Sequence, residues 1–121
     1  MTALVWVGTL AAGGVGAVLR FLIDGAVGRR TGTAFPFGTL AVNLSGAVLL
    51  GLLSGLLLPA DVALIVSTGA VGSYTTFSTW MLETQRLAEE RQTRYAAANL
   101  LSSMVLGLAA AALGRWLVTG W

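Results

Sequence analysis

The stretch Gly69-Ala-Val-Gly-Ser-Tyr-Thr-Thr-Phe-Ser-Thr-Trp80 decides how the rest of the chain is interpreted. It places five Ser and Thr side chains between positions 73 and 79, inside a segment that is otherwise apolar over residues 62–82. A segment of about 20 apolar residues is long enough to cross a bilayer. Because lipid offers no hydrogen bonds, a polar run at this depth is stable only where it faces protein or lines a polar path. The sequence therefore predicts a polar interruption at mid-membrane depth.

The composition of the whole chain is that of an integral membrane protein. Of its 121 residues 56% are hydrophobic and only 10% are charged, whereas soluble domains carry about 25% charged residues. The seven basic residues are all Arg and lie at segment ends, so no basic patch indicates binding to nucleic acid. Cys and His are absent, and the acids lie in the flanks, which argues against thiol, metal-hydrolase and proton-relay chemistry. We expect a single-domain membrane protein, residues 1–121, that is not an enzyme.

Four apolar segments of spanning length predict an all-α membrane fold. They cover residues 3–23, 35–58, 62–82 and 96–118. Residues 25–34 contain two Arg and three Gly and are predicted to form a polar loop, while residues 83–94 are predicted to extend the third segment into solvent.

Small residues recur every four positions in the first, second and fourth segments. Such stripes of Gly and Ala let helices approach closely, either within one bundle or between subunits. Since four short helices alone can hardly enclose a pore, we expect the chain to function as an oligomer in membrane lipid.

Basic residues favour one orientation in the membrane. Six of the seven Arg side chains lie in or beside the first and third connections, and only Arg115 belongs to the opposite side. The positive-inside rule counts basic residues near the membrane and largely ignores acids. It places these two connections in the cytoplasm and both termini outside, as in a multi-pass protein of the cell membrane.

The polar run in the third segment allows two structures. Gly69 and Gly72 weaken a helix where the hydroxyl side chains begin, since Gly lowers helix stability by about 1 kcal/mol relative to Ala. A broken helix would release main-chain carbonyl groups that could bind a cation, as unwound helices do in transporters. In a continuous helix the hydroxyl groups would instead bond to the preceding turn. Periodicity alone does not decide between them.

Other polar and aromatic side chains lie within the apolar segments. Phe77 and Trp80 are three residues apart and share one helix face, where their positive ring edges could guide an anion or the rings could simply pack. Asn43 lies well inside the second segment, where an amide can join helices or offer donors to a ligand. Asn99 and Ser103 share one face of the fourth segment.

These motifs resemble the fluoride channel family Fluc, also called CrcB, in order and in spacing over nearly the whole chain. The matching blocks are Gly13-Gly14-Val15-Gly16-Ala17 with Arg20, Pro36-x-Gly38-Thr39-Leu40-x-x-Asn43-x-x-Gly46, and Gly69-x-x-Gly72-x-x-Thr75-Thr76-Phe77-Ser78-Thr79 with Glu83 beyond it. The Thr-Thr-Phe-Ser-Thr block together with the Asn43 block is highly specific.

The resemblance implies passive, fluoride-selective export through two pores of an antiparallel, dual-topology dimer. It also implies a structural sodium ion at the dimer interface, held by main-chain carbonyls at Gly72 and Thr75 and not transported, which favours the broken helix. The positions that match the fluoride pathway are Asn43, Phe77, Trp80, Thr76, Ser78, Thr79, Asn99, Ser103 and Arg20, the last near the pore entrance.

Two features depart from the family pattern. Trp80 stands where Phe is usual, so a larger ring with an N–H donor could narrow or alter one pathway. The Arg bias is the second, because a homodimer with both orientations needs nearly balanced loops. The chain therefore forms either a homodimer or a heterodimer with a paralogous subunit of opposite orientation.

Two other functions are compatible with four short membrane helices. A small, proton-coupled multidrug exporter would need a carboxylate within the membrane, and the first segment has none before Asp24 at its end. A non-conducting subunit of a heterodimeric channel would keep the Gly and Ala stripes. Such a subunit would not need Asn43 together with Thr75-Thr76-Phe77-Ser78.

Overall fold

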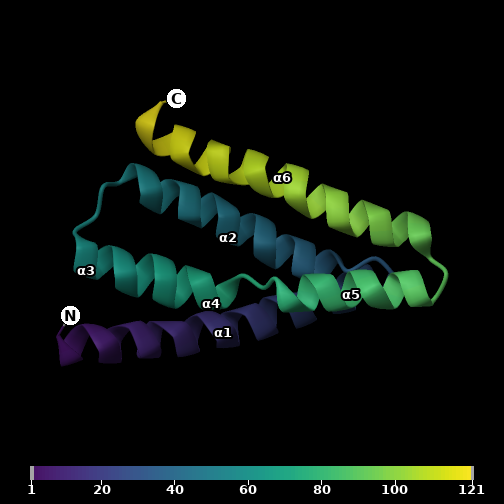
Figure 1. Cartoon of the computed structure of the whole chain (residues 1–121), viewed down its shortest axis with the longest axis horizontal. Helices are drawn as coiled ribbons and strands as arrows, with labels where there is room; N and C mark the ends of the chain where they lie inside the picture. Colours follow the sequence, from purple (N-terminus) through teal and green to yellow (C-terminus); the bar gives the residue numbers. More distant parts are fainter. Residues whose placement is uncertain (1, 121) are drawn as a thin grey trace.

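The computed structural model describes residues 2–120, and every element in this range is helical (Figure 1). The elements in chain order are α1 (Ala3–Thr31), α2 (Phe37–Gly55), α3 (Ala60–Ala63), the π-helix η1 (Leu64–Val71), α4 (Gly72–Tyr74), α5 (Ser78–Glu89) and α6 (Thr93–Thr119). Among the described residues, α1, α2 and α6 are long and apolar enough to cross a membrane. The predicted all-helical class is confirmed, and the third apolar segment is divided among α3, η1, α4 and the start of α5.

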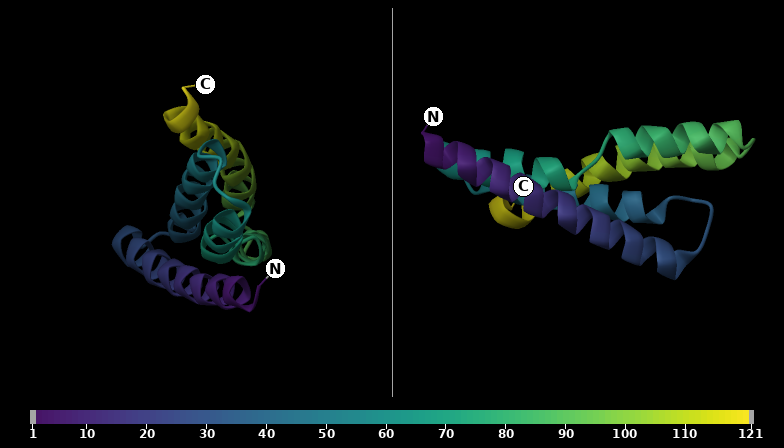
Figure 2. Two further views of the ribbon diagram at one scale, coloured as in Figure 1. Left: turned by 90° about the vertical axis from the view of Figure 1, so that its left-hand side faces the viewer. Right: turned by 90° about the horizontal axis from the view of Figure 1, so that it is seen from below.

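The connections between helices alternate between two ends of the molecule. Both termini and the link from α2 to α3 lie at one end, and the α1–α2 and α5–α6 connections lie at the other (Figure 1). Figure 2 shows that α1 runs obliquely across the other helices instead of parallel to them. The two Arg-rich connections therefore share one end of the molecule.

Glycine residues set the closest approaches between helices. α2 packs along α6, and α1 packs on η1 and α4. At Gly51 of α2 and Gly114 of α6, a Cβ atom would overlap the main chain of the facing helix, and at Gly16 of α1 it would overlap the Ala70 carbonyl of η1. At Gly107, by contrast, a Cβ would meet nothing within 4 Å. Much of the small-residue pattern therefore joins helices within one chain.

α1 continues into the region that the sequence predicted as a polar loop, so that prediction was wrong for residues 25–31. The helix ends at Gly32, whose φ of 58° is the left-handed conformation that suits glycine after a helix. Arg29 and Arg30 lie in the last turn, where positive charge is favourable next to the negative end of the helix dipole. Gly25 and Gly28 weaken this part of the helix without ending it.

The third apolar segment changes its winding twice. It begins as the short helix α3, continues as the π-helix η1 and returns to α-helical geometry for the single turn α4. Thr75 then leaves the helix with extended dihedral angles (φ −77°, ψ 159°), and residues 75–77 lie outside any helix. π-helical segments are uncommon in proteins, but those that occur are often found at functional sites.

Few side chains are fully buried within the chain. The largest are Leu87, Val42, Asn99 and Thr39, so two of the four are polar. Large apolar side chains on α1 and α6 are exposed, among them Leu10 (71%) and Leu108 (75%). An apolar exterior around a partly polar interior is the arrangement expected of a multi-pass membrane protein.

Candidate functional site

The site is built around residues 75–77, which join α4 to α5 and lie outside any helix. Asn43 of α2 pairs with Thr76 at the centre of this interruption. Its Nδ2 atom donates to the Thr76 carbonyl oxygen (2.9 Å), and the Thr76 N–H donates to Oδ1 (2.8 Å). Since an unpaired main-chain group away from water costs about 1–3 kcal/mol, this carboxamide stabilises the non-helical conformation.

Two further hydrogen bonds hold the ends of the flanking helices. The Thr76 hydroxyl oxygen accepts from the Thr79 N–H in the first turn of α5 (3.2 Å), in the manner of an N-cap side chain. The Nε of Arg20, on α1, donates to the Ser73 carbonyl oxygen in α4 (3.4 Å). Its positive charge lies at the C-terminal end of a helical segment, where cations are favoured.

The two aromatic side chains lie together at the start of α5. The ring centroids of Phe77 and Trp80 are 5.6 Å apart with an angle of 81° between their planes, which is an edge-to-face pair. Phe77 is 70% exposed on the surface of the single chain. The indole N–H of Trp80 donates to the main-chain carbonyl of Asn99 on α6 (3.0 Å). This bond leaves the ring edges of Trp80, and not its N–H, as the part that can face a ligand.

α6 buries several polar side-chain atoms, those of Asn99 next to Trp80. Asn99 is fully buried, and its Nδ2 atom donates to the Thr84 hydroxyl oxygen (2.8 Å) and more weakly to the Trp80 carbonyl oxygen (3.4 Å). Asn99 Oδ1 and the hydroxyl oxygens of Ser102 and Ser103 are buried without a hydrogen-bond partner among residues 2–120. A buried polar atom without a partner needs an explanation, and an ion, a water molecule or a second subunit would supply one.

Ser78 and Thr79 open α5 beside the interruption. Ser78 is exposed in the single chain, and Thr79 is half-buried. The structure thus pairs Asn43 with Thr76 and Phe77 with Trp80, and it connects Asn99 to the aromatic pair through Trp80. Ser103 lies one helical turn beyond Asn99 on α6.

Thr39 and Glu83 are two residues that we did not predict as part of the site. Thr39 is 1% exposed, and its hydroxyl group donates to the Glu83 carboxylate of α5. Thr39 could have been predicted from the sequence, because it lies one helical turn before Asn43 and therefore on the same face of α2. This face of α2 meets the interruption at Asn43 and meets α5 at Thr39, which bonds to Glu83.

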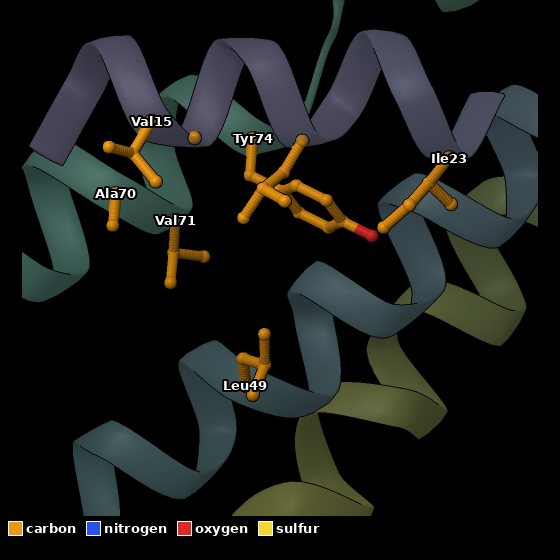
Figure 3. A pocket seen from close by; sticks show the side chains of 8 residues that line it. Val15, Ile23, Leu49, Ala70, Val71 and Tyr74 are labelled. Atoms are coloured by element: carbon orange, nitrogen blue, oxygen red, sulfur yellow. The ribbon is translucent and has the colours of Figure 1, made fainter. Parts of the chain in front are cut away.

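A cavity of about 230 Å³ lies between α1, α2 and the third segment (Figure 3). Its lining comprises Val15, Gly16, Leu19, Ile23, Leu49, Ala70, Val71 and Tyr74. Tyr74 supplies the hydroxyl group of this otherwise apolar lining, and it is hydrogen-bonded to Ser45 (2.8 Å). Because an ion needs several polar partners in place of water, this cavity is not an ion path.

A groove of about 270 Å³ runs along the third segment on the side of α2. It is lined by Asn43, Gly46, Ala47, Leu50, Ser67, Val71, Gly72 and Thr75. The carbonyl oxygens of Gly72 and Thr75 accept no hydrogen bond from any donor within residues 2–120. Uncoordinated carbonyl oxygens are suitable ligands for a hard cation, so these two residues fit the predicted sodium site. Two oxygens are too few for a complete coordination shell, and further ligands would have to come from outside the chain.

Comparison with known proteins agrees with this architecture. Residues 7–115 match the family model described as CrcB-like protein, Camphor Resistance (CrcB). A Mycobacterium bovis protein named Fluoride-specific ion channel FluC 2 is 60% identical over 117 residues, covering 97% of this chain and 93% of the relative. The FluC 2 protein of Mycolicibacterium paratuberculosis is 63% identical over 116 residues (96% and 95%). The FluC 1 protein of Leifsonia xyli is 45% identical over 121 residues (97% and 88%).

The names of these relatives describe ion channels and not enzymes, as the composition of the chain led us to expect. The motifs around Asn43 and Thr76 lie within the matched range, and so does every predicted site residue. From its matched length and its identity to these relatives, the chain belongs to the CrcB family.

Proposed function

We propose that the chain is a subunit of a fluoride-selective channel that exports cytoplasmic fluoride passively, down its electrochemical gradient. The observation that carries the proposal is the polar interruption at residues 75–77, held by Asn43 and flanked by the Phe77–Trp80 pair. It occurs in a chain that is 60% identical to a relative named as a fluoride-specific ion channel. We take the interruption to be the helix break that the family resemblance implies.

Fluoride is strongly hydrated, so the pathway must replace water with donors held in place beforehand. Hydroxyl groups of Thr76, Ser78, Thr79 and Ser103 can supply such donors, together with the Asn43 amide hydrogen that Thr76 does not use. The edges of the Phe77 and Trp80 rings carry partial positive charge and can face the anion. Arg20 raises the local concentration of anions through its electric field.

A structural sodium ion completes the proposal. The free carbonyl oxygens of Gly72 and Thr75 would hold it, and it would join the two subunits without being transported. An antiparallel partner that offers the same two carbonyls would bring the number of protein ligands to four.

The partner is either a second copy or a paralogous subunit. The Arg-rich connections at one end of the molecule favour a single orientation, and hence a paralogous partner inserted the other way. The names FluC 1 and FluC 2 among the relatives are compatible with paired subunits.

The experiment is fluoride efflux from liposomes that contain the purified chain alone or the chain with a paralogous subunit. We expect fluoride efflux from at least one preparation and no chloride efflux from either. Efflux from the chain alone would exclude an obligate heterodimer. A failure of both preparations, with folded protein present in the vesicles, would refute the channel function.

A further inference from the structure

We infer that the side chains of Asn43 and Thr76 release the carbonyl groups of Gly72 and Thr75 by capturing the N–H groups that a continuous helix would place on them. The inference rests on the proposed function, which assigns these two carbonyls to a sodium ion. It makes Asn43 and Thr76 positioning residues for the cation, in addition to their predicted place beside the fluoride pathway.

The first step is the hydrogen-bond pattern of an unbroken helix. Each N–H donates to the carbonyl oxygen four residues earlier. The Thr76 N–H would therefore fill the Gly72 carbonyl, and the Thr79 N–H would fill the Thr75 carbonyl. In such a helix neither oxygen would be available to a cation.

In the structure both of these donors are bound elsewhere. The Thr76 N–H donates to Oδ1 of Asn43 (2.8 Å), and the Thr79 N–H donates to the hydroxyl oxygen of Thr76 (3.2 Å). One side chain from α2 and one from the interruption itself thus accept the two N–H groups that a continuous helix would direct to the carbonyls of Gly72 and Thr75. Gly72 is exposed on the single chain, so a partner from outside can reach this residue.

Neighbouring carbonyl groups differ from this pair. The Val71 carbonyl accepts from the N–H and the hydroxyl group of Thr75 (3.0 and 3.2 Å), and the Ser73 carbonyl accepts from Arg20 (3.4 Å). The Tyr74 carbonyl has no donor among residues 2–120, but no side chain captures the Ser78 N–H that would reach it. Capture by a side chain therefore coincides with the two carbonyls assigned to sodium.

Asparagine is suited to this task because its carboxamide offers an acceptor and a donor in one plane. Oδ1 of Asn43 accepts from the Thr76 N–H, and Nδ2 donates to the Thr76 carbonyl oxygen (2.9 Å). Both main-chain groups of Thr76 are therefore held in a conformation that is not helical. An apolar side chain at position 43 would leave the Thr76 N–H free to return to Gly72. Closing that bond would remove one cation ligand from each subunit.

The inference can be tested by thermal unfolding of the purified dimer at increasing NaCl concentrations. Choline chloride keeps the ionic strength constant. A ligand that binds the folded state raises its melting temperature, and the midpoint of the rise reports affinity. We expect sodium to stabilise the unmodified protein. Asn43→Ala and Thr76→Val should shift the sodium midpoint upward by about tenfold or more, as the loss of about 1.4 kcal/mol of binding free energy would do.

Two matched variants serve as controls. Thr76→Ser keeps the hydroxyl oxygen and should keep the sodium midpoint. Ser54→Ala removes a hydroxyl group of α2 that bonds only to the Gly51 carbonyl of its own helix, and it should also leave the midpoint unchanged. If Asn43→Ala does not fold, the pair Thr76→Val and Thr76→Ser decides, because Val has nearly the shape of Thr.

The possible failures can be told apart. An unmodified protein that gains no stability from sodium, yet conducts fluoride, would overturn the sodium site and with it the inference. Sodium stabilisation with equal midpoints in Thr76→Val and Thr76→Ser would overturn the inference alone. The midpoint of sodium stabilisation is the readout because it reports on the cation site independently of fluoride efflux.

Discussion

Two asparagine side chains each join segments that lie far apart in the sequence. Asn43 joins α2 to the interruption at Thr76, and Asn99 joins α6 to α5 through Thr84 and the Trp80 carbonyl. Both could be predicted as important from the sequence, since an amide inside an apolar segment needs partners. Their partners could not be predicted, because they are atoms of other helices whose positions depend on tertiary packing.

Trp80 gives the first prediction at this scale. In Trp80→Phe the ring and its edges remain, but the hydrogen bond to the Asn99 carbonyl is lost. We expect the free energy of unfolding to fall by about 1 kcal/mol, with fluoride efflux within a few-fold of the original. Denaturation in detergent and liposome efflux measure the two effects. Abolished efflux in a normally stable variant would show that the indole N–H acts on the ion.

Phe77 gives the second prediction. Phe77→Ala removes an exposed ring whose edge-to-face contact with Trp80 contributes about 0.5–1.5 kcal/mol. We expect fluoride efflux to fall by about tenfold or more, because the ring edge that we propose to face the anion is lost; a factor of ten corresponds to about 1.4 kcal/mol. Leu82→Ala, which also shortens an exposed side chain on α5, is the control and should conduct normally. Equal efflux from both variants would remove Phe77 from the pathway.

At the scale of helices, the long apolar elements followed directly from the sequence, and their boundaries did not. The second and fourth predicted segments correspond to α2 and α6 within a few residues. α1 extends past Asp24 because Arg29, Arg30 and Gly32 favour a late helix end. The π-helix η1 could not be predicted from the pattern of apolar residues, since Leu64–Val71 would be equally apolar as an α-helix.

The crossing of α2 and α6 gives a prediction about elements. In Gly51→Ala the new methyl group would overlap the Ala111 carbonyl of α6, so we expect a loss of about 1–3 kcal/mol of stability from overpacking. Gly28→Ala, in the last turns of α1, meets nothing within 4 Å and should be neutral or stabilising by up to about 1 kcal/mol. Unfolding of the two variants side by side measures the difference. Equal stability would mean that the helices can separate at this crossing without cost.

At the scale of the whole molecule, the two Arg-rich connections lie at one end and both termini at the other. The sequence alone predicted this sidedness, because the order of spanning segments fixes which connections share a side. The arrangement of the proposed subunits could not be predicted in this way, since it depends on surfaces between chains. The groove at Gly72, and the buried Ser103 oxygen that has no partner among residues 2–120, are features that the proposed second subunit would complete.

Orientation in the membrane gives the fourth prediction. The chain has no Cys, so single cysteines report sidedness without background. Thr33→Cys, in the α1–α2 connection, should resist a membrane-impermeant thiol reagent in intact cells, and Ala60→Cys, at the other end, should react fully. Half-labelling of both positions would instead indicate a dual-topology homodimer. Lysed cells, in which both cysteines should react, provide the control.

The π-helix η1 has a consequence for how the family's sequences can change length. Each residue of an α-helix advances by about 100° around the axis. The turns of a π-helix hold more residues than α-helical turns, so one residue deleted within Leu64–Val71 could be absorbed by a return to α-helical winding. Gly72 and Thr75 would then keep nearly the same side of the segment, next to Asn43 and the α2 side chains that face them. The π-helix is thus a place where the chain can lose a residue while the proposed cation ligands stay in position.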